Sequence, residues 1–195
     1  MKAVILLCTL KKSGLSNTET LSEFFVEHLK KQKIDCEIIR MIDHAVLPGT
    51  YTDMGKGDEW PMILEKLKKA QIILFATPVW WGNYSSEMQK AIERLDEIHD
   101  EILEGKPSQL DGKVAGIIVT GDSDGAEHIV GNISNFLNGI GIVFPPYCTL
   151  TVLWEGQSKN AKTTRKKLMK KYSDEYTDTA ETMVEQLVKY AEKQR

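Results

Sequence analysis

Five apolar segments of strand length alternate along the chain with stretches in which apolar residues recur every three or four positions. The apolar segments cover residues 3–9, 36–41, 72–76, 114–120 and 142–153. Short apolar runs are typical of β-strands, and the wider spacing is typical of the buried stripe of a helix. Alternating strands and helices predict a parallel sheet with helices on both faces, because right-handed crossover connections place them there.

Three of these segments are apolar throughout, which is typical of central strands that are buried on both faces of a sheet. The second segment contains Glu37 and Arg40, so we predict that it lies near a sheet edge. The last segment is interrupted by Pro145 and Pro146, which suits an edge strand or a bulge. Five strands favour a three-layer α/β/α fold, with all strands parallel and in the order 2-1-3-4-5.

Helices are predicted between the strands from four stripes of apolar residues. The stripes are Leu21, Phe25 and Leu29; Met62, Ile63, Leu67 and Ala70; Met88, Ile92, Leu95, Ile98 and Ile102; and Ile129, Ile133, Phe136, Leu137 and Ile140. A long C-terminal helix is predicted over about 160–194, and residues 42–57 are predicted to form an irregular loop of a length typical of functional loops. The length of 195 residues favours one domain over 1–195.

The first predicted strand is followed by a polar loop and then by a helix. The loop supplies the hydroxyl groups of Thr9, Ser16 and Thr18, and the free amides and dipole at the start of the helix attract anions. A simpler interpretation is open as well, because Ser16 and Glu19 match a helix capping box. Glu19 also places a negative charge near any bound phosphate.

The loop after the third strand is rich in aromatic residues. Pro78 ends the strand because it removes a ladder donor, and Trp80, Trp81 and Tyr84 follow within a few residues. Ligands of open α/β sheets lie beyond the carboxyl ends of the strands, so these rings are placed to stack on a flat ligand. The alternative is that they pack against a helix or a second subunit, since tryptophan is common at interfaces.

The loop after the fourth strand, Gly121–Gly125, contains only small and acidic residues. Taken alone, it is compatible with a plain strand-to-helix turn in which Asp124 caps the helix. The three loops are nevertheless expected at the same edge of the sheet. A helix start beside an aromatic loop there favours a ligand that is both phosphorylated and planar.

The charge, the apolar runs and the cysteines of the chain indicate which partners are excluded and which cell compartment is favoured. A net charge of −3 argues against general nucleic-acid binding, and no apolar run approaches the ~20 residues of a membrane span. Lysines follow the apolar run 3–10 at once, so we interpret this run as a strand rather than a signal peptide. The three cysteines, Cys8, Cys36 and Cys148, are far apart and odd in number, which favours reduced thiols in a cytoplasmic protein.

Four stretches carry a resemblance to a known family: Ser16-Asn17-Thr18, Thr77-Pro78-Val79-Trp80-Trp81-Gly82, Lys90-Ala91-Ile92-Glu93-Arg94 and Gly121-Asp122-Ser123-Asp124-Gly125. With them, residues from about Lys2 to Leu150 resemble the flavodoxin-like NAD(P)H-dependent FMN reductases and the multimeric flavodoxin-type quinone reductases. The resemblance implies a flavodoxin-like fold, FMN as cofactor, and NADH or NADPH as co-substrate. It also implies a small-molecule electron acceptor such as a quinone.

The resemblance implies a set of FMN-binding residues. The phosphate would be held by Thr9, Ser16, Asn17 and Thr18, with Lys11 and Lys12 where family members usually have arginine. The flavin ring would lie beside Pro78, Val79, Trp80, Trp81 and Gly82 and approach Gly121, Asp122 and Gly125. Because the chemistry takes place on the flavin, no catalytic side chain is expected. Iron–sulfur relatives place cysteines between the second strand and the second helix, and residues 42–57 contain none, so no cluster is expected. The four histidines show no metal-ligand spacing, so no other metal is expected either.

Three functions are compatible with these features. The favoured one is a flavoenzyme that oxidises NAD(P)H, and the second is a flavodoxin-type electron carrier without nucleotide activity. Carriers of that kind are typically strongly acidic, so the net charge of −3 favours the enzyme. The third is a protein that uses the aromatic loop only for association. The aromatic residues near Met88 exceed what one flavin needs, which predicts a homodimer or higher oligomer.

Overall fold

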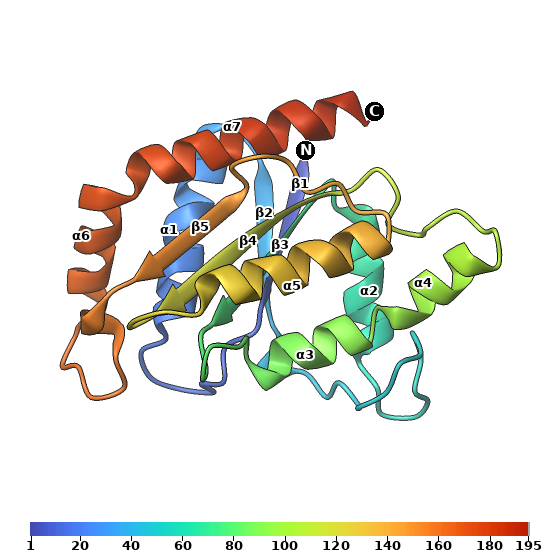
Figure 1. The fold of residues 1–195 in the computed structure, drawn as a ribbon, viewed down its shortest axis with the longest axis horizontal. Helices are drawn as coiled ribbons and strands as arrows, with labels where there is room; N and C mark the ends of the chain where they lie inside the picture. The colour runs from blue at the N-terminus through green and yellow to red at the C-terminus, as the bar shows by residue number, and fades with distance from the viewer. Residues whose placement is uncertain (195) are drawn as a thin grey trace.

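The computed structural model describes residues 1–194 and contains a five-stranded sheet in which all strands are parallel (Figure 1). The strands are β1 (Lys2–Leu7), β2 (Asp35–Arg40), β3 (Ile72–Pro78), β4 (Val114–Gly121) and β5 (Thr149–Leu153). Their order is β2-β1-β3-β4-β5, which confirms the predicted fold class. The two strands with polar or proline interruptions lie at the edges, as their composition predicts.

Helices form a layer on each face of the sheet (Figure 1). One layer contains α1 (Asn17–Lys31), α6 (Arg165–Glu175) and α7 (Thr177–Lys193), and the other contains α2 (Trp60–Lys69), α3 (Ser86–Glu93), α4 (Asp96–Leu103) and α5 (Ala126–Gly139). Neighbouring residues of a strand point to opposite faces, so Ile5 packs in the first layer and Leu6 in the second. Within residues 1–194, no helix combines the length and the apolar composition that crossing a membrane requires.

Strand β4 carries a glycine where α7 lies directly over the sheet. A Cβ atom at Gly116 would lie 2.5 Å from Met183 Cε and 2.8 Å from Leu74 Cδ2. Side chains in a close-packed core leave no room for atoms at such distances. Gly116 therefore sets how closely the C-terminal helix approaches the centre of the sheet.

The apolar stripe from Met88 to Ile102 predicts a continuous helix, and this prediction is wrong. The structure ends α3 at Glu93 and begins α4 at Asp96, with an i→i−3 hydrogen bond of 3.1 Å from the Leu95 amide to the Ile92 carbonyl between them. Arg94 is fully buried, because its side chain enters the loop that precedes α2. The apolar spacing continues through the break, so periodicity alone does not reveal it.

The C-terminal helix predicted over about 160–194 is divided as well. Helix α6 begins at Arg165, after Thr164 accepts a 3.3 Å hydrogen bond from the amide of Lys167. It packs on α1, whereas α7 packs on β4 and β5. Two packing surfaces require a change of direction, and Tyr176 supplies it with a φ of −123° and a ψ of 5°.

Two further predictions are corrected by packing. In α2 the predicted buried residue Met62 is 45% exposed, and Trp60 is buried in its place. The predicted last strand over 142–153 is reduced to β5, preceded by one isolated bridge between Val143 and Val114. Tyr147 interrupts the strand because its φ of 63° is incompatible with extended backbone.

Residues 44–59 form an irregular loop around a buried ion pair. Arg94 Nη2 lies 2.6 Å from Asp58 Oδ2, and both side chains are fully buried. Arg94 also donates to the carbonyl oxygens of Tyr51 and Leu47 at 2.8 and 2.7 Å. Burial alone would raise the pKa of Asp58, but hydrogen bonds from Arg94 and from three backbone amides lower it to about 2.

Candidate functional site

The carboxyl ends of the parallel strands meet at one edge of the sheet, and four chain segments lie together there (Figure 1). The segments are 8–16 after β1, 79–85 after β3, 122–125 after β4 and 154–164 after β5. Open α/β sheets bind their ligands at this edge. The first three segments contain the residues predicted to bind the ligand, and the fourth is not part of that prediction.

The segment after β1 combines a helix start with hydroxyl donors. Ser16 Oγ accepts a 3.2 Å hydrogen bond from the Glu19 amide and thereby caps α1, and Thr9 Oγ1 lies 3.0 Å from Ser16 Oγ. The two hydroxyls share one hydrogen in this contact, so the other is free to donate. Among residues 1–194, no acceptor binds the amides of 13–18. Free amides at a helix start beside a hydroxyl form a donor set suited to a phosphate.

Asn17 and Thr18 use their side chains within the protein. Thr18 Oγ1 lies 2.7 Å from Thr120 Oγ1 at the end of β4, and both hydroxyls are buried. Asn17 Nδ2 donates to the carbonyl oxygen of Gln157 at 2.8 Å. These contacts fasten the start of α1 to β4 and to the segment after β5. The groups that Asn17 and Thr18 keep free here are their backbone amides.

Arg40, the last residue of β2, is a cation at this loop that the sequence analysis missed. Its Nη2 donates to the Lys11 carbonyl at 2.8 Å, its Nη1 pairs with Asp43 Oδ2 at 2.7 Å, and its Nε lies 3.2 Å from Glu19 Oε1. Lys11 itself donates from Nζ to the carbonyl of Leu15 at 2.6 Å. Both cations therefore brace the loop backbone. An arginine at the carboxyl end of an edge strand was the available signal.

Trp81 and Gly82 form the tip of a tight turn in the second segment. The amide of Trp80 donates to the Asn83 carbonyl at 2.7 Å, and the Asn83 amide donates back at 2.9 Å. Trp81 has a φ of 50° and Gly82 a φ of 71°, as in a type I′ turn. A bulky residue at positive φ is strained. Trp81 is nevertheless 101% exposed and Trp80 43%, so the turn holds aromatic rings in solvent.

The third segment touches the second through glycines. Gly125 has a φ of 92°, and a Cβ atom on it would lie 2.6 Å from Gly82 Cα. A Cβ atom on Gly121 would lie 2.9 Å from Val79 Cγ2. The two backbones are therefore in direct contact at a position that only glycine fits. Gly125 is also the N-cap of α5, so the predicted cap at Asp124 is wrong.

The other predicted residues of these segments lie beside this contact. The amide of Val79 donates to the Thr120 carbonyl at 2.7 Å, which extends the pairing of β3 and β4 beyond Pro78. Asp122 is exposed and accepts a 3.3 Å hydrogen bond from Ser123. Pro78, Val79 and Asp122 are thus brought to the same edge as the exposed tryptophans.

Ser85 joins the second segment to β1. Its amide donates to Thr77 Oγ1 at 3.0 Å, its hydroxyl donates to the Cys8 carbonyl at 2.5 Å, and its Oγ accepts the Met88 amide at 3.2 Å. Burial, with a smaller contribution from Glu87, raises the pKa of the Cys8 thiol well above its ordinary value. The thiol therefore stays protonated and is a poor nucleophile.

The residues at this edge fit a phosphorylated flavin by the chemistry of their donors. Free amides and a hydroxyl suit a phosphate, and exposed indole rings beside a glycine contact suit a planar ring system. The assignment of individual residues to FMN stays a prediction. Gln157, which accepts from Asn17, belongs to the same edge and was missed because it follows an edge strand in a segment without a motif.

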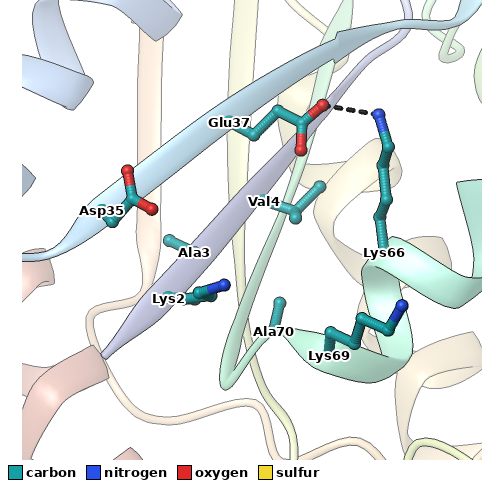
Figure 2. Close-up of a pocket in the computed structure, with 8 residues that line it drawn as sticks. All are labelled: Lys2, Ala3, Val4, Asp35, Glu37, Lys66, Lys69 and Ala70. Atoms are coloured by element: carbon teal, nitrogen blue, oxygen red, sulfur yellow. Dashed lines mark hydrogen bonds and ion pairs between the residues drawn. The ribbon is translucent and has the colours of Figure 1, made fainter.

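Figure 2 shows a pocket at the opposite, amino edge of the sheet, between β1, β2 and the end of α2. Its charged residues are Lys2, Asp35, Glu37, Lys66 and Lys69. Lys66 Nζ pairs with Glu37 Oε1 at 2.6 Å. Because the pocket lies at the amino ends of the strands, it is separate from the edge where the predicted binding residues meet.

Residues 1–152 match the NADPH-dependent FMN reductase family, and the chain therefore belongs to this family. The predicted family resemblance is confirmed. FMN and a nicotinamide nucleotide, the predicted cofactor and co-substrate, are those of the family name. The matched residues include the first three segments of the site and end just before the fourth.

Individual relatives are similar to the chain in sequence or in fold. The chain is 34% identical over 156 residues to 8-demethyl-8-aminoriboflavin-5′-phosphate synthase of Streptomyces davaonensis, an alignment that covers 75% of this chain and 61% of the relative's length. The crystal structure of RosB with bound 8-demethyl-8-formylriboflavin-5′-phosphate is similar with a TM-score of 0.76 at 27% identity, covering 99% of this chain and 79% of that one. FerB, an NAD(P)H:(acceptor) oxidoreductase from Paracoccus denitrificans, shares the fold with a TM-score of 0.69 at 18% identity, covering 99% and 98%.

Proposed function

We propose that this protein uses bound FMN to carry electrons from NADH or NADPH to a small acceptor such as a quinone. The observation that supports it most is the meeting of an amide-rich helix start with two exposed tryptophans at the carboxyl edge of the sheet. Phosphate and flat ring have different chemical requirements, and this edge meets both. Family membership supports the same cofactor.

Within this proposal, the phosphate is held by Thr9, Ser16 and the backbone amides of Asn17 and Thr18, with the segment braced by Lys11. The ring lies beside Pro78, Val79, Trp80, Trp81 and Gly82 and approaches Gly121, Asp122 and Gly125. FMN, when bound, supplies hydride acceptance and electron release. The protein contributes binding, orientation and a site from which competing reactions are excluded.

An enzyme of this kind has to leave one face of the ring open. Hydride transfer requires the nicotinamide to stack on the flavin with reacting atoms about 3–3.5 Å apart. Among the three segments predicted to bind the flavin, the aromatic residues belong to the second, whereas Gly121–Gly125 contains none. The third segment is therefore unable to form the second wall of an aromatic sandwich, and this supports an enzyme over a pure electron carrier.

Anaerobic reduction of the FMN-loaded protein tests the proposal. NADH or NADPH should bleach the flavin absorbance in a saturable, single-turnover reaction, and a quinone added afterwards should restore it. If neither nucleotide reduces the bound flavin faster than free FMN, while dithionite does, the carrier function replaces the enzyme. A chain that quenches no FMN fluorescence would support association as the only role of the aromatic loop.

A second candidate is that FMN is a substrate rather than a resident cofactor. The observation behind it is the 34% identity to 8-demethyl-8-aminoriboflavin-5′-phosphate synthase, since that relative's name describes an altered flavin. Mass analysis of the flavin released after turnover separates the two. Unchanged FMN supports the cofactor role, and a changed mass supports the substrate role.

We also propose that the protein forms a homodimer or higher oligomer through its exposed aromatic residues. Trp80 and Trp81 project from the binding edge, where they are 43% and 101% exposed. Exposed apolar groups of this size mark interfaces in many proteins. Light scattering at working concentration should give at least twice the chain mass, and a monomeric mass would contradict the proposal.

A further inference from the structure

Gln157 lies in a short turn, η2 (Glu155–Gln157), directly after β5, and is only 7% exposed. Its Nε2 donates to the carbonyl oxygens of Gly121 and Val152, both at 2.8 Å. Its Oε1 accepts a 2.8 Å hydrogen bond from the Tyr172 hydroxyl, and its backbone carbonyl accepts one from Asn17 Nδ2 at 2.8 Å. One buried residue therefore connects four others through four short hydrogen bonds.

The partners of Gln157 belong to parts of the chain that are far apart in sequence. Asn17 is the first residue of α1, Gly121 is the last residue of β4, and Tyr172 lies within α6. The Tyr172 hydroxyl also lies 3.4 Å from the Asn17 carbonyl, so the three elements close into a ring of contacts. We call Gln157, Tyr172, Asn17 and Gly121 the Gln157 clamp.

Every hydrogen-bonding group of the Gln157 side chain has a partner within the protein. A glutamine side chain has two amide hydrogens and one carbonyl oxygen, and all three are used within the protein. Gln157 therefore has no donor left for a ligand. Two of its partners, however, are residues at which the ligand is expected: the helix start at Asn17 and the strand end at Gly121.

Two of the four clamp residues lie beyond the part of the chain that matches the family. The match covers 1–152, whereas Gln157 and Tyr172 follow it. The Gly121 carbonyl is held twice from this C-terminal side, by Gln157 and by the amide of Trp154 at 3.0 Å. The C-terminal segment of this chain is thus hydrogen-bonded to the carboxyl edge of the sheet, which the family-matched residues form.

We propose that Gln157 is a positioning residue of the flavin site, which fixes the phosphate-binding start of α1 relative to the strand end at Gly121. The inference rests on the proposed function only in taking FMN as the ligand. Removing a partner from a buried hydrogen bond leaves the other group unsatisfied. Without the Gln157 side chain, the Gly121 carbonyl loses one of its two donors, and the backbone carbonyl at position 157, which accepts from Asn17, is no longer held in place by that side chain. The two halves of the site therefore shift relative to each other.

The substitution Gln157→Leu removes the side-chain bonds at similar volume, and Ser108→Ala is a matched control. Ser108 Oγ donates to the Ile140 carbonyl at 2.6 Å, but it lies before β4, at the opposite end of that strand. We expect Gln157→Leu to weaken FMN binding about tenfold or more, because all three side-chain hydrogen bonds of Gln157 are lost. Riboflavin, which lacks the phosphate, should lose less, and Ser108→Ala should leave both affinities unchanged.

The rate of amide hydrogen exchange in the flavin-free chain measures the mobility of the two segments without the cofactor. In Gln157→Leu, exchange should accelerate at 13–18 and 121–125, whereas Ser108→Ala should leave these amides as in the natural chain. Tyr172→Phe removes one hydroxyl only and should shift both measurements in the same direction by about threefold, which keeps the test available if Gln157→Leu folds poorly.

The two proposals fail in different ways. If FMN binds with unchanged affinity and exchange at both segments is unchanged in Gln157→Leu and Tyr172→Phe, the clamp is not a positioning device. If the natural chain binds FMN but no nucleotide reduces it, the proposed electron transfer fails. The FMN affinities of Gln157→Leu and Tyr172→Phe then still test whether the clamp positions the site. If the natural chain binds no FMN, the flavin proposal fails, and faster exchange supports the clamp only as a structural connection.

Discussion

Residues 44–59 and 79–85 are both irregular segments with glycines at positive φ, yet different contacts hold them in place. In 44–59, the buried Arg94–Asp58 pair gathers backbone carbonyls and amides into one network. In 79–85, a turn closed by two backbone hydrogen bonds carries Trp81 fully into solvent. The longer segment satisfies its groups internally, and the shorter one leaves its largest rings available for a partner.

This difference shows that loop length does not reveal how much of a loop is held by internal contacts. The predicted loop 42–57 has a length that is typical of functional loops, and the sequence left its role open. Hydrogen bonds from Arg94 hold the loop between β2 and α2 in place. A strained, exposed tryptophan has no such internal explanation and is the better sign of a binding surface.

The largest effect is expected from breaking the buried pair. Arg94→Ala leaves the Asp58 carboxylate buried without its partner, and such a change typically costs about 3–5 kcal/mol of unfolding free energy. Urea unfolding measures it. Arg165→Ala is the control, because its ion pair with Glu23 is exposed and should be worth less than about 1 kcal/mol. A loss below that value in Arg94→Ala would show that the loop is not held by the pair.

The pH dependence of the same variant gives the sign of the interaction. The pKa of Asp58 is lowered from 3.8 to about 2 in the folded state, so its contribution is present above pH 3.8 and is lost as pH falls toward 2. The natural protein should therefore lose stability through this range. Arg94→Ala should show a weaker decline, because the hydrogen bond that lowers the pKa has been removed.

A smaller effect is expected where the second and third segments touch. Gly125→Ala places a Cβ atom 2.6 Å from Gly82 Cα, whereas Gly55→Ala, at nearly the same φ, places it in open space. Positive φ costs each alanine about 1–2 kcal/mol, and overpacking adds about 1–3 kcal/mol at Gly125 alone. Gly125→Ala should therefore lower the unfolding free energy more than Gly55→Ala, and only Gly125→Ala should weaken FMN binding. If both variants lose the same unfolding free energy, the two loops move apart to accept the extra Cβ atom at no further cost.

The strands were predictable because an apolar run is a local property of the sequence. The convergence of Trp80, Trp81 and Gly125 was predictable too, since loops that follow parallel strands share an edge. The break at Arg94 was not, because its partners Tyr51 and Leu47 are 43 and 47 residues away and the apolar period continues through it. Gln157 was missed for the same reason, as its contacts reach 140 residues back to Asn17.

The smallest and most informative change is Trp81→Gly. Glycine relieves a positive-φ strain of about 1–2 kcal/mol but adds about 0.5–1 kcal/mol of unfolded-state entropy. The unfolding free energy of the dilute, flavin-free chain should therefore stay level or rise by up to about 1.5 kcal/mol, while FMN or quinone binding weakens. Both are measured on one preparation, by urea unfolding and by fluorescence quenching. If stability instead falls, and falls more at high protein concentration, Trp81 contacts a second copy and the aromatic turn serves association. A loss of ligand affinity without loss of stability assigns the exposed ring to the ligand, which is the outcome that the contrast with the self-contained loop 44–59 predicts.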